Sequence, residues 1–301
     1  MKSWIKLSFG LQNKQFINKL FHKKMHQYTW VFFLLPSMLG VLIFVLLPFL
    51  DVIRRSFVTA VTSRFVGVSN YSTIFHNTAF LLALKNTGLF TVACLPVLII
   101  FSFLVAVLLQ KTRLVQSIKS ILLLPMAVPA ATLVLVWKML FADNGNVNYY
   151  LSLLGMEHVR FMETNAAFFV LVGSYVWKNL GYTVLLWLTG IMSISDAYLE
   201  AAKVDGASDT ACLFYVIMPN LKPTLYTITV ISFLNSFKVF REAYLVAGSY
   251  PHESMYLLQH LFNNWFTNLE LDKMAAAAVC IFLVLFVVVM VLQHLWDREE
   301  M

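Results

Sequence analysis

Long apolar runs separated by short polar segments dominate the pattern of hydrophobic and polar positions along the chain. Each run is close to the ~20 residues that a helix needs to cross the ~30 Å hydrocarbon core of a bilayer. Lipid offers the backbone no hydrogen-bond partners, so such spans are expected to be helical. The six runs cover residues 29–50, 86–109, 118–141, 167–190, 224–247 and 274–295. The pattern therefore predicts an all-α integral membrane protein with six transmembrane helices.

Composition agrees with this prediction. The chain is 60% hydrophobic and only 12% charged, whereas soluble domains have roughly 25% charged residues. The first apolar run begins well inside the chain and has no small-residue cleavage site. It is therefore expected to remain as a span and not to be removed as a signal peptide. The predicted location is the inner or plasma membrane of a cell, as a multi-pass protein in contact with the lipid bilayer.

Basic residues predict the orientation of the spans. The first 28 residues contain six lysines and no acidic residue, and basic flanks of this kind stay in the cytoplasm. Nucleic-acid binding is the weaker interpretation of this tail. Six spans then place both termini and the polar segment 191–223 on the cytoplasmic side. The predicted organisation is a basic tail (1–28), a six-helix membrane domain (29–295) and a second cytoplasmic tail (296–301).

Several kinds of chemistry have no sequence support. Cys94, Cys212 and Cys280 lack C-x-x-C spacing, so neither a disulfide framework nor a zinc site is predicted. His22 and His26 are four residues apart, as helical metal ligands would be, but in a lysine-rich tail a solvated face is the more reasonable interpretation. No glycine is followed by lysine, which excludes the phosphate-binding G-x-x-x-x-G-K-[ST] motif. We expect no catalytic residues, metal or cofactor in this chain.

The polar segment 191–223 is predicted to form a helix, a turn and a second helix at the cytoplasmic surface. Ser193 or Ser195 suits the N-cap of the first helix, and Asp196 in its first turn favours the positive end of the helix dipole. Gly206 permits the positive φ that ends a helix, and Pro219 and Pro223 are expected to stop the second one before the fifth span begins. From geometry alone, an ordinary amphipathic helix lying at the membrane interface explains this segment equally well.

The same segment resembles a known motif. Its sequence is Glu200, Ala201, Ala202, two further residues, Asp205, Gly206, Ala207 and then Pro219, thirteen residues after the glycine. This order resembles the EAA loop of permease subunits in binding-protein-dependent ABC importers, especially the carbohydrate branch of maltose and glycerol-phosphate permease type. Further matching positions are Leu35-Pro36, Leu47-Pro48, Phe65-Val66-Gly67, Asn70-Tyr71, Asn86-Thr87, Leu124-Pro125, Pro129, Trp137, Trp177-Lys178, Ser236-Phe237 and Glu242.

The resemblance implies a transport subunit that is not itself an enzyme. It implies the type I ABC importer architecture, with the loop docked on a cytoplasmic ATPase and passing its motion to the spans. The implied partners are a second, different permease subunit, two ATPase subunits and an extracytoplasmic solute-binding protein. ATP and Mg²⁺ would be bound by the ATPases. The expected function is import of a sugar or oligosaccharide by alternating access.

Charged residues inside predicted spans are candidates for function, because a charge near the bilayer centre costs about 2.5–3.5 kcal/mol on insertion scales. Lys138 is near the end of its span and is expected to reach the surface with its long side chain. Lys178 lies in mid-span. Lys238 and Glu242 are four residues apart, a spacing that allows an ion pair on one helix face. An ion pair bracing the bundle and a substrate contact are equally consistent with this pattern.

Sugars stack on aromatic rings and accept hydrogen bonds from amide and charged side chains. The candidate substrate path is Tyr175, Trp177, Lys178, Asn179, Asn235, Phe237 and Lys238. Ordinary packing is the alternative role, because aromatic residues are frequent in membrane proteins. Pro125 and Pro129 free backbone carbonyls in the third span, which is tolerated only against protein or a wet cavity. That span is therefore expected near the path.

Two other classes of protein remain as alternatives to the importer subunit. An ion-coupled secondary transporter of a small polar solute would use Lys178 or Glu242 as an ion or proton relay. A membrane scaffold would need neither buried charges nor the polar segment 191–223. Neither alternative accounts for that segment.

Overall fold

The computed structural model describes residues 31, 33–110, 112 and 115–297. This part is helical, and its only β feature is an isolated bridge between Val58 and Phe65. The all-α prediction is confirmed for these residues. The tail 1–28, with His22 and His26, and residues 298–301 lie outside them.

Four described helices are long and apolar enough to cross a membrane. They are Phe33–Arg55, α4 (Thr78–Gln110), α8 (Ala166–Met192) and Leu271–Trp296, which belongs to α15 (Leu271–Asp297). A bent pair of helices in the third predicted span would raise the number to five. The described part therefore has four or five candidate spans where six were predicted.

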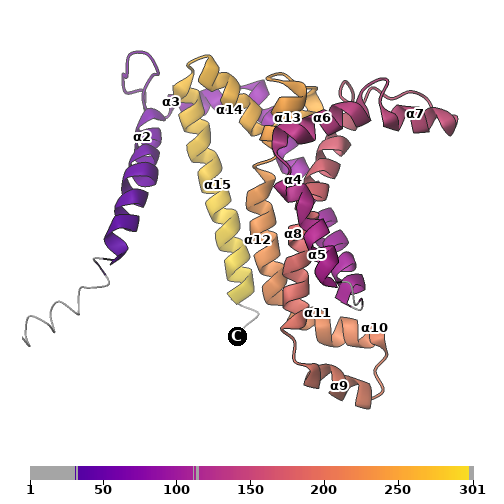
Figure 1. Cartoon of the computed structure of the whole chain (residues 1–301). Helices are drawn as coiled ribbons and strands as arrows, with labels where there is room; N and C mark the ends of the chain where they lie inside the picture. The colour runs from indigo at the N-terminus through magenta and orange to yellow at the C-terminus, as the bar shows by residue number, and fades with distance from the viewer. Residues whose placement is uncertain (1–30, 32, 111, 113–114, 298–301) are drawn as a thin grey trace, which may run out of the picture.

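The first helix is attached to the rest of the bundle near one end (Figure 1). It contains a π-helical turn, η1 (Leu42–Leu46), followed by α2 (Leu47–Arg55). Pro48 lacks the N–H that would bond one turn back, so the helix widens before it. Near its end the Phe49 ring lies 4.7 Å from that of Phe282 in α15. No residue in the apolar window of this helix is buried.

The third predicted span is sharply bent. It consists of α5 (Val115–Ala127) and α6 (Ala130–Phe141). The stretch Ile118–Ala127 is bent by 93° from the stretch Ala130–Leu153, which begins with α6. Pro129 is the N-cap of α6, with extended backbone at ψ 142°. Proline disfavours helical geometry in the residue before it and cannot donate to the preceding turn. The predicted disturbance of this span by proline is thus confirmed.

The fifth predicted span is not one helix, and the expectation of a continuous helix over 224–247 is wrong. α12 (Lys222–Ser236) ends before a turn at residues 237–239, and α13 (Phe240–Ala247) follows. Gln259, in α14 (Leu258–Thr267), donates a hydrogen bond through Nε2 to the carbonyl of Phe237. A partner from another helix therefore satisfies the backbone where the span is interrupted.

The interruption also changes the expected pairing of Lys238. This residue lies in the turn, so it does not share continuous helical spacing with Glu242. Its Nζ instead donates to Asn235 Oδ1 at 2.9 Å. The side chain of Glu242 lies outside the described part.

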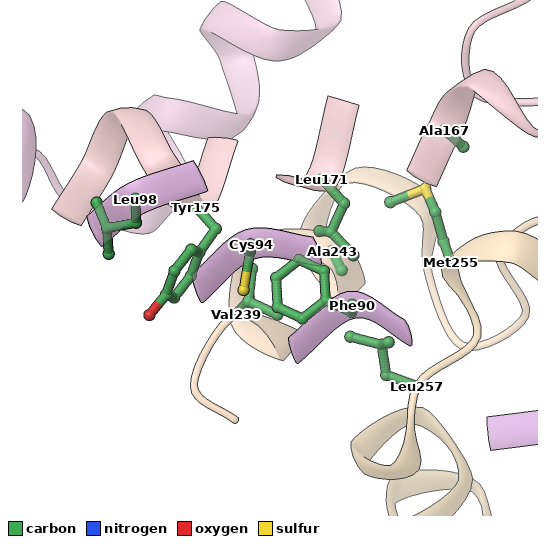
Figure 2. Close-up of a cluster of buried hydrophobic side chains, with 10 residues drawn as sticks. All are labelled: Phe90, Cys94, Leu98, Ala167, Leu171, Tyr175, Val239, Ala243, Met255 and Leu257. Atoms are coloured by element: carbon green, nitrogen blue, oxygen red, sulfur yellow. The ribbon is translucent and has the colours of Figure 1, made fainter. Parts of the chain in front are cut away.

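Helix α8 is at the centre of the bundle and packs against α4, α5 and α12. Figure 2 shows Phe90 and Cys94 of α4 beside Tyr175 of α8, with the Phe90 and Tyr175 rings 5.6 Å apart. A Cβ at Gly181 would lie 1.7 Å from the carbonyl oxygen of Leu122 in α5. The close approach of α5 to α8 therefore depends on glycine at this position.

Asn86 and Thr87 attach the segment between α13 and α14 to α4. Asn86 Nδ2 donates to the carbonyls of Glu253 and Tyr256 at 2.5 and 3.1 Å. Thr87 Oγ1 accepts from the backbone N–H of Leu258 at 3.0 Å. These bonds satisfy buried backbone groups in a segment that makes few of its own.

Smaller helices gather at the end of the bundle opposite α9 (Asp196–Val204), as Figure 1 shows. They are α3 (Ser69–Phe75), α7 (Asn146–Leu153), η3 (Glu253–Met255) and α14. The described end of α15 lies toward the other end of the bundle, where α9 projects (Figure 1).

Candidate functional site

The polar segment folds as a helix, a turn and a second helical stretch. α9 is followed by α10 (Asp209–Cys212), the π-turn η2 (Leu213–Ile217) and α11 (Met218–Asn220). Figure 1 shows the hairpin projecting from the end of the bundle. The helix–turn–helix prediction is confirmed.

Gly206 ends α9 in the left-handed region, with φ +83°. The N–H of Gly206 donates to the carbonyl of Lys203 at 3.0 Å, and the N–H of Ala207 donates to that of Ala202 at 2.9 Å. This pair of bonds is the Schellman arrangement, which satisfies the last carbonyls of a helix. The Asp-Gly-Ala part of the motif therefore ends α9 through its backbone hydrogen bonds.

The ends of the other helices differ in part from expectation. Ser195 occupies the N-cap of α9 but makes no capping bond with its side chain. Ser208, which the sequence analysis missed, caps α10 by accepting from the N–H of Ala211 at 3.2 Å. The second helical stretch passes Pro219 and ends at Asn220, and Pro223 lies in the first turn of α12, which follows. The π-turn η2 precedes Pro219, as η1 precedes Pro48, because each proline lacks a donor.

One face of the hairpin packs on the bundle and the other is exposed. Leu199 and Leu213 lie against a buried cluster that contains Trp187 of α8 and Ile228 of α12. The motif residues Glu200, Ala201, Asp205 and Gly206 are exposed, Ala202 and Ala207 are half-buried, and Pro219 is exposed. The hairpin is therefore anchored to the two helices that precede and follow it.

The exposed face of the hairpin carries large apolar side chains. Tyr198, Val204 and Tyr215 are 62%, 88% and 83% exposed, respectively. Large apolar side chains that are this exposed suit a contact with another protein. Glu200, also exposed, adds an acidic group to the hairpin.

A cavity of about 200 Å³ lies inside the bundle. Its lining residues are Met126, Ser174, Tyr175, Lys178, Asn179, Asn235, Lys238 and Val239. Met126 comes from the last turn of α5, next to the bend, and Lys238 from the turn between α12 and α13. Both interrupted spans thus meet at this cavity.

Five of the predicted path residues therefore come together, from two segments of the chain: Tyr175, Lys178, Asn179, Asn235 and Lys238. Hydrogen bonds hold two of them in place. Tyr175 Oη donates to the carbonyl of Ser232 at 2.6 Å, and Asn179 Nδ2 donates to that of Tyr175 at 2.8 Å. The cavity wall combines amide, hydroxyl and ammonium groups, which are the groups that bind hydroxylated solutes.

Trp177 and Phe237 lie outside the lining of this cavity. The Trp177 ring is 6.2 Å from that of Trp137 in α6, nearly perpendicular to it. The Phe237 ring lies 5.5 Å from that of Phe233 and borders an apolar groove of about 290 Å³ along α4, α12 and α15. Both residues were predicted to line the path because they are aromatic. The sequence does not give the direction of their side chains, so it could not exclude them.

Three lining residues escaped prediction: Met126, Ser174 and Val239. Ser174 is four residues before Lys178 in α8, so helical periodicity places the two on one face. That spacing was a usable signal in the sequence. Val239 lines the cavity only because the span is interrupted beside it.

Most of the chain matches one protein family. Residues 84–299 match the family described as binding-protein-dependent transport system inner membrane component. The sn-glycerol-3-phosphate transport system permease protein UgpA of Escherichia coli O157:H7 is 28% identical over 247 residues, 79% of this chain and 82% of UgpA. The arabinooligosaccharides transport system permease protein AraP of Halalkalibacterium halodurans is 28% identical over 264 residues, 84% and 83% of the two chains.

Solved structures share the fold. A bacterial ABC transporter involved in the import of the acidic polysaccharide alginate matches 92% of this chain and 98% of its own, with a TM-score of 0.82 and 23% identity. The same type of transporter in complex with an alginate pentasaccharide-bound periplasmic protein gives a TM-score of 0.81 at 22% identity. With the match over residues 84–299, the chain belongs to the family of binding-protein-dependent transport system inner membrane components.

Proposed function

We propose that this chain is a transmembrane permease subunit of an ATP-driven ABC importer for a sugar or oligosaccharide. The observation that carries the proposal is the α9–α11 hairpin, which projects from the bundle and exposes Glu200, Ala201, Asp205 and Gly206. Exposure of these residues, together with the large apolar side chains of the hairpin, suits contact with a cytoplasmic partner. The relatives UgpA and AraP are permease proteins of transport systems, which supports this choice.

In the proposed topology the chain crosses the membrane six times. The α5–α6 pair and the α12–α13 pair each form one interrupted crossing beside the four continuous helices. Both tails, 1–28 and 296–301, and the hairpin lie in the cytoplasm, and residues 29–295 form the membrane domain. The position of the described end of α15, away from α14 and toward the hairpin end, supports this arrangement (Figure 1).

The proposed assembly contains a second, different permease, two ATPase subunits and an extracytoplasmic solute-binding protein. The first helix, Phe33–Arg55, supports the second permease, because its apolar window has no buried residue within this chain. The alginate transporter was solved with a periplasmic protein, which supports the binding protein. ATP and Mg²⁺ are bound by the ATPases, and this chain carries no catalytic residue or cofactor.

The hairpin is connected directly to the helices that line the cavity. α8 carries Lys178 and leads into α9, while α11 leads into α12, which carries Asn235. Leu199 of the hairpin packs in the same cluster as Trp187 of α8 and Ile228 of α12. A push on the exposed face therefore moves both helices together, and this is the proposed route from ATP binding to alternating access.

Uptake into membrane vesicles tests the proposal. The complete system should need internal ATP and the binding protein, and uptake should persist after collapse of the proton and sodium gradients. Uptake that a gradient drives without ATP would contradict the proposal and favour an ion-coupled secondary transporter.

A further inference from the structure

The cavity has an unusual charge for the interior of a membrane bundle. Two of its eight lining residues, Lys178 and Lys238, carry ammonium groups. None of the eight is acidic. Charged groups within spans are costly and normally face a water-filled cavity or a counter-charge. The ammonium group of Lys238, which is exposed, therefore supplies positive charge at the cavity wall.

Lys238 lines the cavity at the point where the span is interrupted. It lies in the turn between α12 and α13, and its side chain is exposed. Its Nζ bonds to the neutral amide oxygen of Asn235 at 2.9 Å. An ammonium group has three donors, so this bond leaves donors that face an incoming group. The bond between Gln259 and the carbonyl of Phe237 fixes the turn beside it.

We propose that this cavity binds an anionic group, a carboxylate or a phosphate, and that the imported solute is an acidic carbohydrate. This inference rests on the proposed function as an importer. Lys238 is the main contact. Asn179, Asn235 and Ser174 supply hydrogen bonds to hydroxyl groups beside the charge. Charge-assisted bonds from lysine to carboxylate or phosphate are about twice as strong as neutral ones.

The cavity size agrees with recognition of one charged sugar unit. Pockets for drug-sized ligands are about 300–1,000 Å³, whereas this cavity is about 200 Å³. It accommodates a charged group and its neighbouring hydroxyls, while the rest of a longer chain lies outside it. Selection therefore acts on the charged unit and not on overall length.

Binding of three probes to the purified complete complex in lipid nanodiscs tests the proposal. The probes are glucuronate, glucose 6-phosphate and glucose, each radiolabelled for equilibrium binding. We expect at least one charged probe to bind about tenfold more tightly than glucose, as a charge-assisted bond would give. Preference for glucuronate identifies a carboxylate, and preference for glucose 6-phosphate identifies a phosphate. Equal binding of all three probes, or no binding of any, would overturn the proposal.

Variants connect the preference to Lys238. Lys238→Gln should remove the preference for the charged probe, and Lys238→Arg should retain it. Lys85→Gln is the matched control, because Lys85 is exposed on α4 and does not line the cavity. An unchanged preference in Lys238→Gln would overturn the proposal. A Glu242→Gln variant provides a further test. Loss of the preference to the same extent in that variant would also overturn the proposal, because Lys238 would then act through an ion pair within the chain.

A second measurement separates this inference from the proposed function. The ATPase activity of the same complex is measured with and without its solute-binding protein, purified from native cells with its solute bound. Stimulation supports the importer function whatever the probes show. Charge-selective binding without stimulation would leave the charged site established and refute the importer mechanism.

Discussion

At the scale of single residues, Gly206 gives the sharpest prediction. A Cβ there would meet nothing within 4 Å, but φ is +83°, which costs about 1–2 kcal/mol for a side chain in the left-handed region. Gly206→Val should therefore deform the hairpin without a clash. We expect normal membrane insertion, at least tenfold slower uptake and weaker retention of the ATPase on purification. Gly206→Asn is the control, because asparagine tolerates this conformation. Normal uptake by the valine variant would refute a coupling role for the turn.

Glu200 tests the charge of the exposed hairpin face. Its side chain is exposed in the middle of α9, so its role depends on a partner and not on packing within this chain. We expect Glu200 to meet a basic side chain of the ATPase. Glu200→Lys should therefore weaken ATPase docking, because two like charges would then meet in a contact that excludes water. Glu200→Gln keeps the size and should have a smaller effect. Pull-down of the ATPase from membranes that express each variant measures the difference, and equal recovery would contradict the prediction.

His260 makes the bundle sensitive to acid. The side chain is fully buried, its Nδ1 accepts from the N–H of Leu257 at 3.2 Å, and burial lowers its pKa from 6.5 to about 4. The unfolded chain binds a proton in this range while the folded protein does not, so stability is full above pH 6.5 and falls toward pH 4. The total loss is about 3 kcal/mol. Thermal unfolding in detergent should show this slope, and His260→Phe should reduce it. An identical slope in the variant would contradict the assignment.

At the scale of helices, two glycines of α8 predict opposite outcomes. Gly181→Ala places a Cβ 1.7 Å from the Leu122 carbonyl oxygen, whereas Gly173→Ala meets nothing within 4 Å. The first substitution must push α5 away from α8, at a cost of about 1–3 kcal/mol, while the second should be nearly neutral. Thermal unfolding of the purified subunit compares them. Equal midpoints would show that α5 and α8 are not held at this distance in the membrane.

Of the two interrupted spans, one was predictable from the sequence and the other was not. Pro129 is a local signal, so the bend between α5 and α6 was predictable from its missing N–H. The turn at 237–239 has no proline or glycine, and its carbonyl partner, Gln259, is 22 residues further along the chain. A tertiary contact of this kind leaves no trace in local hydropathy. Five residues chosen from sugar chemistry line one cavity, but the direction of Trp177 and Phe237 depended on packing against other helices.

At the scale of the whole molecule, the proposed importer subunit leaves ATP binding and hydrolysis to its ATPase partners. It lacks a phosphate-binding G-x-x-x-x-G-K-[ST] motif, and its hairpin exposes Tyr198, Val204 and Tyr215, which suits docking of another protein. The purified subunit should therefore neither bind nor hydrolyse ATP, and from native membranes it should co-purify with a cytoplasmic ATPase. Radiolabelled nucleotide binding and phosphate release measure the first part, with the complete complex as positive control. Saturable ATP hydrolysis by the isolated chain would refute the proposal that partner subunits hydrolyse ATP, because the membrane subunit itself would then do so.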